Sequence, residues 1–394
     1  MHFFTKLFLV TLLIVTSSNI KAQQKGIVIE GVLKDNYEMT IPYVAVAIPK
    51  MNIGTTSTEE GTFYLLLQDR NLQDTLVVSS MGFKTYRIKI EDYLHQKDKT
   101  IVLEDDVNEL ETVVIKSMKE YVPELLKVLK ETFLSDTHQL NLVYRRSDVQ
   151  QGVSKFFVEH HMSMIMKGPR SNIKSFEVNQ VRKSADYRIS KRKQWNHAAV
   201  YMMDLNPMKD HYTPMKKMKW NKIGTSTYDG EDVVILEGTK ENVDGLDGTV
   251  TTTIYVGYDT NNVYRIESSV GKCVYQYAKN ADGKMYLSYH KREYQGHEKI
   301  SKLHQEGLGL KTPQISTSYK HEAFVLSVIT DKKKFTAKGY EEWDKDMADI
   351  KLPYNPTFWD NLSLPPETAF YKKIKEELES NCGVPLETQF KYSN

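Results

Sequence analysis

Short runs of β-forming residues separated by turn signals fill residues 26–104, and this pattern predicts a sandwich of antiparallel strands. The run YVAVAIP alternates Val44, Val46 and Ile48 with two alanines. One face of this predicted strand therefore carries bulk, and the other admits a close neighbour. Pro42 precedes the run at a strand start, where its missing N–H donor is tolerated.

The stretch GTTSTEEGTFYLLL, residues 54–67, consists of two β-forming runs around a polar turn, and its pattern predicts a β-hairpin. Gly61 can supply the positive φ that closes such a turn, and Phe63 would then point its ring into the sandwich. Glu59 and Glu60 fall at the tip, where exposure to solvent explains them. The hairpin is therefore expected to be structural, with the function elsewhere in the chain.

A helix and then longer, Tyr-rich strands follow the sandwich. Residues 105–136 are expected to form an acidic linker and a helix, because Leu125 and Leu129 belong to a set of apolar residues at helical intervals. Residues 137–340 contain β-forming runs and Asp-Gly turn pairs, which predict a larger antiparallel β domain. Residues 341–394 are expected to form an aromatic loop and a C-terminal helix. The predicted fold class is mainly β.

The N-terminus has the pattern of a secretory signal peptide, assigned to residues 1–22. Lys6 precedes the apolar run LFLVTLLIV, which is shorter than the roughly 20 residues that span a bilayer. Cleavage is expected after Ala22, and a retained anchor is the alternative. No later segment has the pattern of a transmembrane helix. We therefore expect an exported protein of the periplasm or outer membrane, with the cell surface as an alternative.

Charge argues against a nucleic-acid partner. Removal of the expected signal peptide takes away Lys6 and Lys21 and no acidic residue, so the formal charge falls from +2 to zero. Nucleic-acid binding depends on clustered Lys and Arg that neutralise phosphates. The two cysteines, Cys273 and Cys382, are too few for a disulfide scaffold, although they could pair in an oxidising compartment.

A search for catalytic motifs predicts no catalytic, cofactor-binding or metal-binding residue. HExxH, GxSxG, Walker and dinucleotide patterns are absent. His290 and Glu293 have the spacing of a zinc carboxypeptidase pair, but positions three apart on a strand point to opposite faces. The adjacent His160 and His161 diverge for the same reason. A hydrolase that uses these residues without a recognisable motif is kept as an alternative.

Aromatic residues are abundant, with 24 Tyr and 4 Trp. Aromatic rings near polar loops could contact sugar or lipid, whereas half-buried strand positions also favour Tyr. The four Trp near such loops are Trp195, Trp220, Trp343 and Trp359.

Residues 26–103 resemble the carboxypeptidase regulatory-like domain that begins many exported Bacteroidetes proteins, a transthyretin-like β-sandwich. Ser57 and Thr58 depart from the usual Thr and Asp of this pattern, although the Thr58 hydroxyl can still cap the turn. This domain is a non-catalytic appendage of the peptidases, so the resemblance implies scaffolding or recognition. The residues that carry the resemblance are Gly31, Pro42, Gly54, Thr55, Gly61, Phe63, Gly82 and Phe83.

The rest of the chain resembles uncharacterised envelope proteins that carry this domain, and its strand texture is similar to the half-barrel of lipoprotein carriers. The leading hypothesis is a non-catalytic envelope protein that binds a partner protein, a glycan or an apolar ligand and needs no cofactor. Binding of lipid or lipoprotein in the second domain is an alternative of the same class, and a hydrolase is the alternative from the enzyme class.

Overall fold

The structure is a computed structural model in which the first described part of the chain forms a sandwich of two small sheets. The expected signal peptide and most of the linker before the first long helix lie outside the described residues. The described residues are 26–67, 72–106, 118–169, 171–191, 215–243, 246–339 and 345–393.

One sheet of the sandwich has the order β4, β1, β7, and the other has the order β3, β2, β5, β6. β1 pairs antiparallel with β4 but parallel with β7, which differs from the predicted antiparallel sandwich. A tight hairpin would make β7 antiparallel to the strand before it. Because α2 precedes β7, the chain can instead cross over and place β7 parallel to β1. The elements are β1 (Ile27–Lys34), β2 (Ala45–Ile48), β3 (Ile53–Thr56), β4 (Thr62–Leu67), β5 (Thr75–Ser79), β6 (Tyr86–Lys89), α2 (Ile90–His95) and β7 (Thr100–Val102).

The predicted hairpin over residues 54–67 is instead a corner between the two sheets. β3 pairs with β2, whereas β4 pairs with β1, so the segment between them crosses the sandwich. The Thr58 hydroxyl accepts hydrogen bonds from the backbone N–H groups of Glu60 and Thr62, both at 3.3 Å. Gly61 closes the corner at φ 74°, and Phe63 is 1% exposed in the sandwich core. The prediction of a polar turn was right, but strand pairing depends on contacts that local pattern does not contain.

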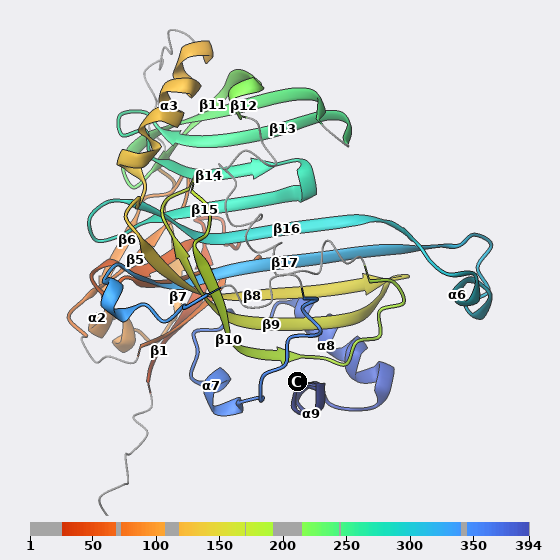
Figure 1. Ribbon diagram of the computed structural model, residues 1–394. Helices are drawn as coiled ribbons and strands as arrows, with labels where there is room; N and C mark the ends of the chain where they lie inside the picture. Colours follow the sequence, from red (N-terminus) through yellow and green to blue (C-terminus); the bar gives the residue numbers. More distant parts are fainter. Residues whose placement is uncertain are drawn as a thin grey trace, which may run out of the picture.

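A large antiparallel sheet forms the second part of the molecule. Its order is β11, β12, β13, β14, β15, β16, β17, β8, β9, β10, and a bridge from Ser327 of β17 to Ile53 joins it to the sandwich. Figure 1 shows this sheet curled into an open half-barrel. The strands are β8 (His138–Gln150), β9 (Val153–Met166), β10 (Ser175–Lys183), β11 (Lys219–Tyr228), β12 (Glu231–Val243), β13 (Leu246–Gly257), β14 (Val263–Ser268), β15 (Cys273–Lys279), β16 (Met285–Lys299) and β17 (Gln314–Ile329).

Helices cover both faces of the large sheet (Figure 1). α3 packs its apolar side chains with those of β8 to β16 in the largest core cluster, and we call this side the α3 face. α8 and α9 pack on β9 and β10 from the other side, which we call the α8 face. The helices are α3 (Met118–Thr132), α6 (Lys302–Gly307), α7 (Pro356–Asp360), α8 (Ala369–Cys382) and α9 (Leu386–Ser393), and 3₁₀ turns lie at Pro49–Met51, Met215–Lys217, Val270–Lys272 and Lys332–Lys334.

The mainly β fold class is confirmed, with a sandwich, a helix, a larger antiparallel sheet and C-terminal helices. β8, β9 and β17 are buried on both faces, because each face packs against its own helices or the sandwich. Within the described residues, no helix has both the length and the apolar character needed to cross a bilayer.

Candidate functional site

The residues that carry the family resemblance have structural surroundings in the sandwich. A Cβ on Gly31 would lie 2.3 Å from the Lys99 carbonyl oxygen, so only glycine fits there. A Cβ on Gly54 would lie 2.9 Å from the carbonyl oxygen of Val46 on the paired strand. Thr55 is buried on β3, and Pro42 precedes β2. None of these positions faces a cavity described below.

Gly82 and Phe83 lie where the sandwich meets the large sheet. The Gly82 N–H donates to the Thr227 carbonyl at 2.9 Å, and the Asp106 N–H donates to the Gly82 carbonyl at 2.9 Å. Phe83 packs on the sandwich core. This part of the family pattern therefore contacts the second domain directly.

Both cysteines are free thiols, so the disulfide considered from the sequence is not formed. Cys273 is buried at the start of β15 in the cluster on the α3 face. Cys382 ends α8 on the other side of the sheet, where its Sγ contacts the Leu378 carbonyl oxygen at 3.7 Å. The large sheet separates the two elements that carry them.

The histidines considered for a metal site point to opposite faces, as strand geometry predicts. His290 stacks on Tyr275 with ring centroids 4.4 Å apart, whereas Glu293 lines a cavity on the α8 face. His161 contacts the Phe358 ring on the α8 face, and His160 is buried on the α3 face. In the described ranges, no three His, Cys, Asp or Glu side chains gather where they could hold a metal ion.

Two of the four tryptophans lie outside the described residues, namely Trp195 and Trp343. Trp359 is 2% exposed in α7, under the Arg182 guanidinium at 4.6 Å. Trp220 is partly buried against the α3-face cluster and donates from Nε1 to the Met215 carbonyl at 2.8 Å. These two tryptophans are core and rim residues.

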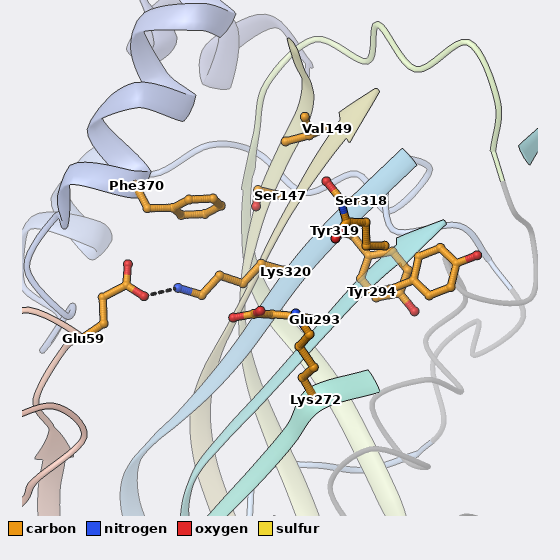
Figure 2. Close-up of a pocket in the computed structure, with 11 residues that line it drawn as sticks. Glu59, Ser147, Val149, Lys272, Glu293, Tyr294, Ser318, Tyr319, Lys320 and Phe370 are labelled. Atoms are coloured by element: carbon orange, nitrogen blue, oxygen red, sulfur yellow. Dashed lines mark hydrogen bonds and ion pairs between the residues drawn. The ribbon is translucent and has the colours of Figure 1, made fainter. Parts of the chain in front are cut away.

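A pocket of about 340 Å³ opens on the α8 face where three parts of the chain meet, and we call it the junction pocket (Figure 2). Glu59 comes from the sandwich corner, Phe370 from α8, and the other side chains from the large sheet and its 3₁₀ turn. Its lining residues are Glu59, Ser147, Val149, Lys272, Glu293, Tyr294, Gln295, Ser318, Tyr319, Lys320 and Phe370.

The sheet wall of the junction pocket follows from strand register. Glu293, Lys320 and Ser147 are neighbours across β16, β17 and β8, so they form a row on one face. Gln295, Ser318 and Val149 form the next row. Because these partners are far apart in the chain, only the folded sheet brings them together.

An ion pair binds the sandwich corner to this wall, and another lies within the wall. Lys320 Nζ lies 2.9 Å from Glu59 Oε2, and Figure 2 shows the two side chains meeting across the pocket. Glu293 Oε1 lies 3.2 Å from Lys291 Nζ. The expectation that Glu59 is simply solvated is wrong, because the corner is packed against β17.

Glu60 is engaged as well, at the start of α8. Its Oε1 accepts a hydrogen bond from the Ala369 backbone N–H at 2.5 Å. A helix N-terminus has unpaired N–H groups and partial positive charge, so a carboxylate is stabilising there. The sandwich corner thus positions α8 and, with it, the Phe370 ring that stands 4.8 Å from Lys320 Nζ.

The Phe370 ring and hydroxyl groups complete the pocket. The Tyr294 and Tyr319 rings stack with centroids 5.1 Å apart on the opposite face of the sheet, since their strand neighbours Glu293 and Lys320 face the pocket. The Ser147 hydroxyl is fully buried, and its Oγ has no hydrogen-bond partner among the residues that the structure describes. A buried hydroxyl without a partner is costly, so this group is suited to a ligand atom in the pocket.

A row of charged residues crosses five strands next to the row that contains Glu293, Lys320 and Ser147, two residues along each strand. Neighbours in register alternate in sign, and the order from β16 to β10 is Lys291, Glu322, Arg145, Glu159 and Arg182. The Glu322 carboxylate accepts hydrogen bonds from the Tyr289 and Tyr371 hydroxyls. Burial, together with the nearby Glu322 charge, raises the pKa of both tyrosines well above its usual value. These phenols therefore remain donors at neutral pH.

Neither Ser147 nor Lys320 belongs to a recognisable sequence motif. A charged residue inside an apolar strand was the available signal, since Lys320 and Glu322 interrupt the buried run of β17. Which strand lies beside them depends on long-range register, which one sequence does not show.

Comparison with known proteins confirms the family resemblance of the sandwich. Residues 29–115 match the model of the CarboxypepD_reg-like domain. No curated protein matches the chain.

Solved structures similar to the chain each align with about half of it. A putative outer membrane lipoprotein-sorting protein domain from Vibrio parahaemolyticus is 9% identical, with a TM-score of 0.28 over 54% of this chain and 94% of that chain. A LolA superfamily protein from Nitrosomonas europaea is 16% identical, with a TM-score of 0.22 over 54% and 96%. Lipoprotein LppX from Mycobacterium tuberculosis is 11% identical, with a TM-score of 0.19 over 51% and 93%.

Proposed function

We propose that this protein is a non-catalytic binding protein of the cell envelope that takes a sugar unit of a glycan in the junction pocket. The observation that carries this proposal is the buried Ser147 hydroxyl, which lines the pocket without a hydrogen-bond partner among the described residues. The N-terminal signal-peptide pattern supports export.

The chemistry of the pocket favours a polyhydroxy ligand. Glu59 and Glu293 offer acceptors, Lys272 and Lys320 offer donors, and serine hydroxyls can do both. The Phe370 ring supplies an apolar surface beside these groups. The C–H groups on one face of a sugar ring can pack on such a surface while the hydroxyl groups form hydrogen bonds. A volume of about 340 Å³ lies within the range of small-ligand sites, which occur preferentially between domains.

Binding without catalysis is supported by the way the pocket's charges are paired. Each carboxylate has a lysine partner, Glu59 with Lys320 and Glu293 with Lys291. A serine nucleophile needs a base within hydrogen-bond reach, and the described residues place none beside Ser147 Oγ. These features suit recognition of a neutral ligand.

Titration calorimetry of the mature protein with defined xylo-, malto-, cello- and chito-oligosaccharides tests the proposal. We expect one series to bind in one-to-one stoichiometry and to remain intact after incubation. Release of shorter sugars would show an enzyme, and binding by none of the series would remove the glycan proposal.

Ser147→Ala gives a sharper test of the site. Removal of a hydroxyl that has no protein partner should leave the free energy of unfolding nearly unchanged, whereas glycan affinity should fall by about tenfold. Thr252→Val is the matched control, because its buried Oγ1 also has no partner among the described residues and lies on β13, away from the pocket. Equal affinities for Ser147→Ala and the unmodified protein would contradict the assignment.

The hydrolase alternative is separated by metal content and by activity. We expect the purified protein to show the same folding and binding before and after metal stripping. Stoichiometric zinc or calcium, together with hydrolysis that one point substitution abolishes, would favour the enzyme.

A further inference from the structure

A second cavity, of about 480 Å³, lies between the large sheet and the two C-terminal helices, and we call it the helix-side cavity. Arg145 of β8, Glu159 of β9 and Arg182 of β10 line it from the sheet. Side chains of α8 and α9 line it from the other side. It shares no lining residue with the junction pocket, so the two sites can be tested separately.

Glu159 holds both guanidinium groups through their Nε atoms only. Arg145 Nε donates to Glu159 Oε1 at 2.6 Å, and Arg182 Nε donates to Glu159 Oε2. Burial by itself would raise the pKa of Glu159, but the two guanidinium charges outweigh it and lower that pKa. The carboxylate is therefore ionised and already accepts one hydrogen bond on each oxygen.

The terminal nitrogens of Arg145 have no acceptor in the described part of the chain. Arg145 is 4% exposed, and its only hydrogen bond there is the one from Nε. A guanidinium carries five N–H donors, so four remain. The Tyr371 ring covers one face of the group at 4.4 Å, which leaves its edge for a ligand. Buried donors of a charged group without acceptors are unfavourable, so this arrangement favours an acceptor in the cavity.

The electrostatics of the sheet favour an anion at this position. At the end of the charge row that lines the cavity, Arg145 and Arg182 share the single carboxylate of Glu159, so this end of the row carries an excess of positive charge. The helix side of the cavity carries three carboxylates and one cation, namely Glu367, Glu379, Glu387 and Lys375. Two of these carboxylates are engaged: Glu379 accepts from the Leu386 N–H at 2.8 Å, and Glu387 accepts from the Tyr354 hydroxyl at 2.6 Å. They oppose an anion near the helices, and thus direct its charge towards the sheet.

Apolar side chains line the part of the cavity between the sheet and the helices. Phe157 from β9, Ile374 from α8 and Phe390 from α9 line it, and all three are buried. If each heavy atom takes roughly the 30 Å³ of a water molecule, the volume of about 480 Å³ admits about 16 atoms. A carboxylate with a medium-length apolar chain matches both the charge and the walls.

We propose that the helix-side cavity binds a medium-chain carboxylate, with the anionic head on the terminal nitrogens of Arg145 and Arg182 and the chain between the sheet and α8. Bidentate guanidinium–carboxylate contacts give both affinity and orientation. The site lies on the α8 face, and its ligand differs in class from the neutral sugar proposed for the junction pocket.

Titration of the mature chain with sodium octanoate tests the assignment. Calorimetry measures the affinity, and NMR shifts of the Ile374 methyl groups report where the ligand binds. Octanol has the same chain without the charge. We expect octanoate to bind at one site and octanol to bind on the order of tenfold more weakly. Equal binding of the two would overturn the role of the arginines, and no binding of octanoate at millimolar concentration would overturn the site.

Two substitutions test where the carboxylate and the apolar chain of the ligand bind. Arg145→Met should remove octanoate binding, and Arg146→Met is the matched control, because Arg146 is an equally buried, ion-paired arginine on the opposite face of the same strand. If Arg145→Met does not fold, Ile374→Phe still tests the proposal, since the larger ring fills the cavity and leaves the ion pairs intact. Ser147→Ala should leave octanoate affinity unchanged. Octanoate binding unaffected by Ile374→Phe would contradict the proposal.

Discussion

His161 lies on β9 with its ring against Phe358 of α7, at a centroid distance of 5.1 Å. Burial lowers the pKa of this imidazole from 6.5 to about 4. A neutral imidazole is therefore part of the packing between the sheet and α7. Burial lowers the pKa of the neighbouring His160 in the same direction, to about 3. The stability of the fold at acidic pH therefore depends on single buried histidines.

We predict that His161→Gln reduces the acid sensitivity of the fold. Because the folded-state pKa lies below the unfolded value, His161 contributes stability that is present above pH 6.5 and is lost as pH falls towards 4. Urea unfolding at several pH values across this window should show a shallower loss for the variant. His297→Gln is the control, because His297 is exposed on β16. Parallel curves for the variant and the unmodified protein would contradict the prediction.

A second prediction concerns Gly61 at the sandwich corner. Its φ is 74°, and a Cβ there would lie 2.8 Å from the Leu33 carbonyl oxygen, so Gly61→Val should cost about 3 kcal/mol of unfolding free energy. The corner also places Glu59 in the junction pocket, so glycan affinity should fall as well. Gly283→Val is the control, because this glycine has φ 75° with open space around it and should lose only about 1 to 2 kcal/mol. Unchanged glycan affinity in Gly61→Val would separate the corner from the pocket.

Among the larger elements, α8 is the one whose position links the two cavities. Its N-terminus is held by Glu60, its first turn carries Phe370 into the junction pocket, and its middle carries Ile374 into the helix-side cavity. Thr368 caps the helix with a hydrogen bond from the Tyr371 N–H, and Gly383 ends it at φ 66°. A sandwich residue thus helps to place a helix that begins 309 residues later in the chain.

We predict that Glu60→Ala destabilises the protein by about 1 kcal/mol, because an N–H group at the start of α8 loses its carboxylate. Differential scanning calorimetry measures the change. Glu376→Ala is the control, since Glu376 is exposed on the same helix and away from its N-terminus. If both substitutions have the same effect, the contact from the sandwich does not stabilise α8.

Hydrogen bonds at several separate points join the sandwich to the large sheet. The Val328 N–H donates to the Asn52 carbonyl at 3.0 Å, and the Gly82 N–H donates to the Thr227 carbonyl at 2.9 Å. The Ser363 hydroxyl accepts from the Leu66 N–H at 2.9 Å, which adds the C-terminal loop. The sandwich is therefore held by the sheet and by the C-terminal segment together.

We predict one cooperative unfolding transition for the mature chain, because the boundary contacts couple the two parts. The isolated segment 26–106 should unfold at a lower temperature than the full chain, since it loses these contacts. Calorimetry of both samples measures the difference. Two resolved transitions in the full chain, with one matching the isolated segment, would show that the parts unfold independently.

Local pattern predicted much of the secondary structure and little of either cavity. The alternation in YVAVAIP correctly predicted β2, in which Val46 and Ile48 are fully buried. The spacing of Leu125 and Leu129 correctly predicted α3. Strand geometry also separated His290 from Glu293 correctly. The corner differs from the predicted hairpin, because pairing between strands depends on partners outside the local window.

The sequence by itself determined the class of the fold and the identity of the sandwich, because strand periodicity, turn residues and glycine positions are local properties of the chain. Only the tertiary structure decided which polar side chains meet. Ser147 and Lys320 are 173 positions apart, and they become neighbours solely through the register of β8 on β17. Register is a property of the assembled sheet, so both proposed sites became visible only in three dimensions.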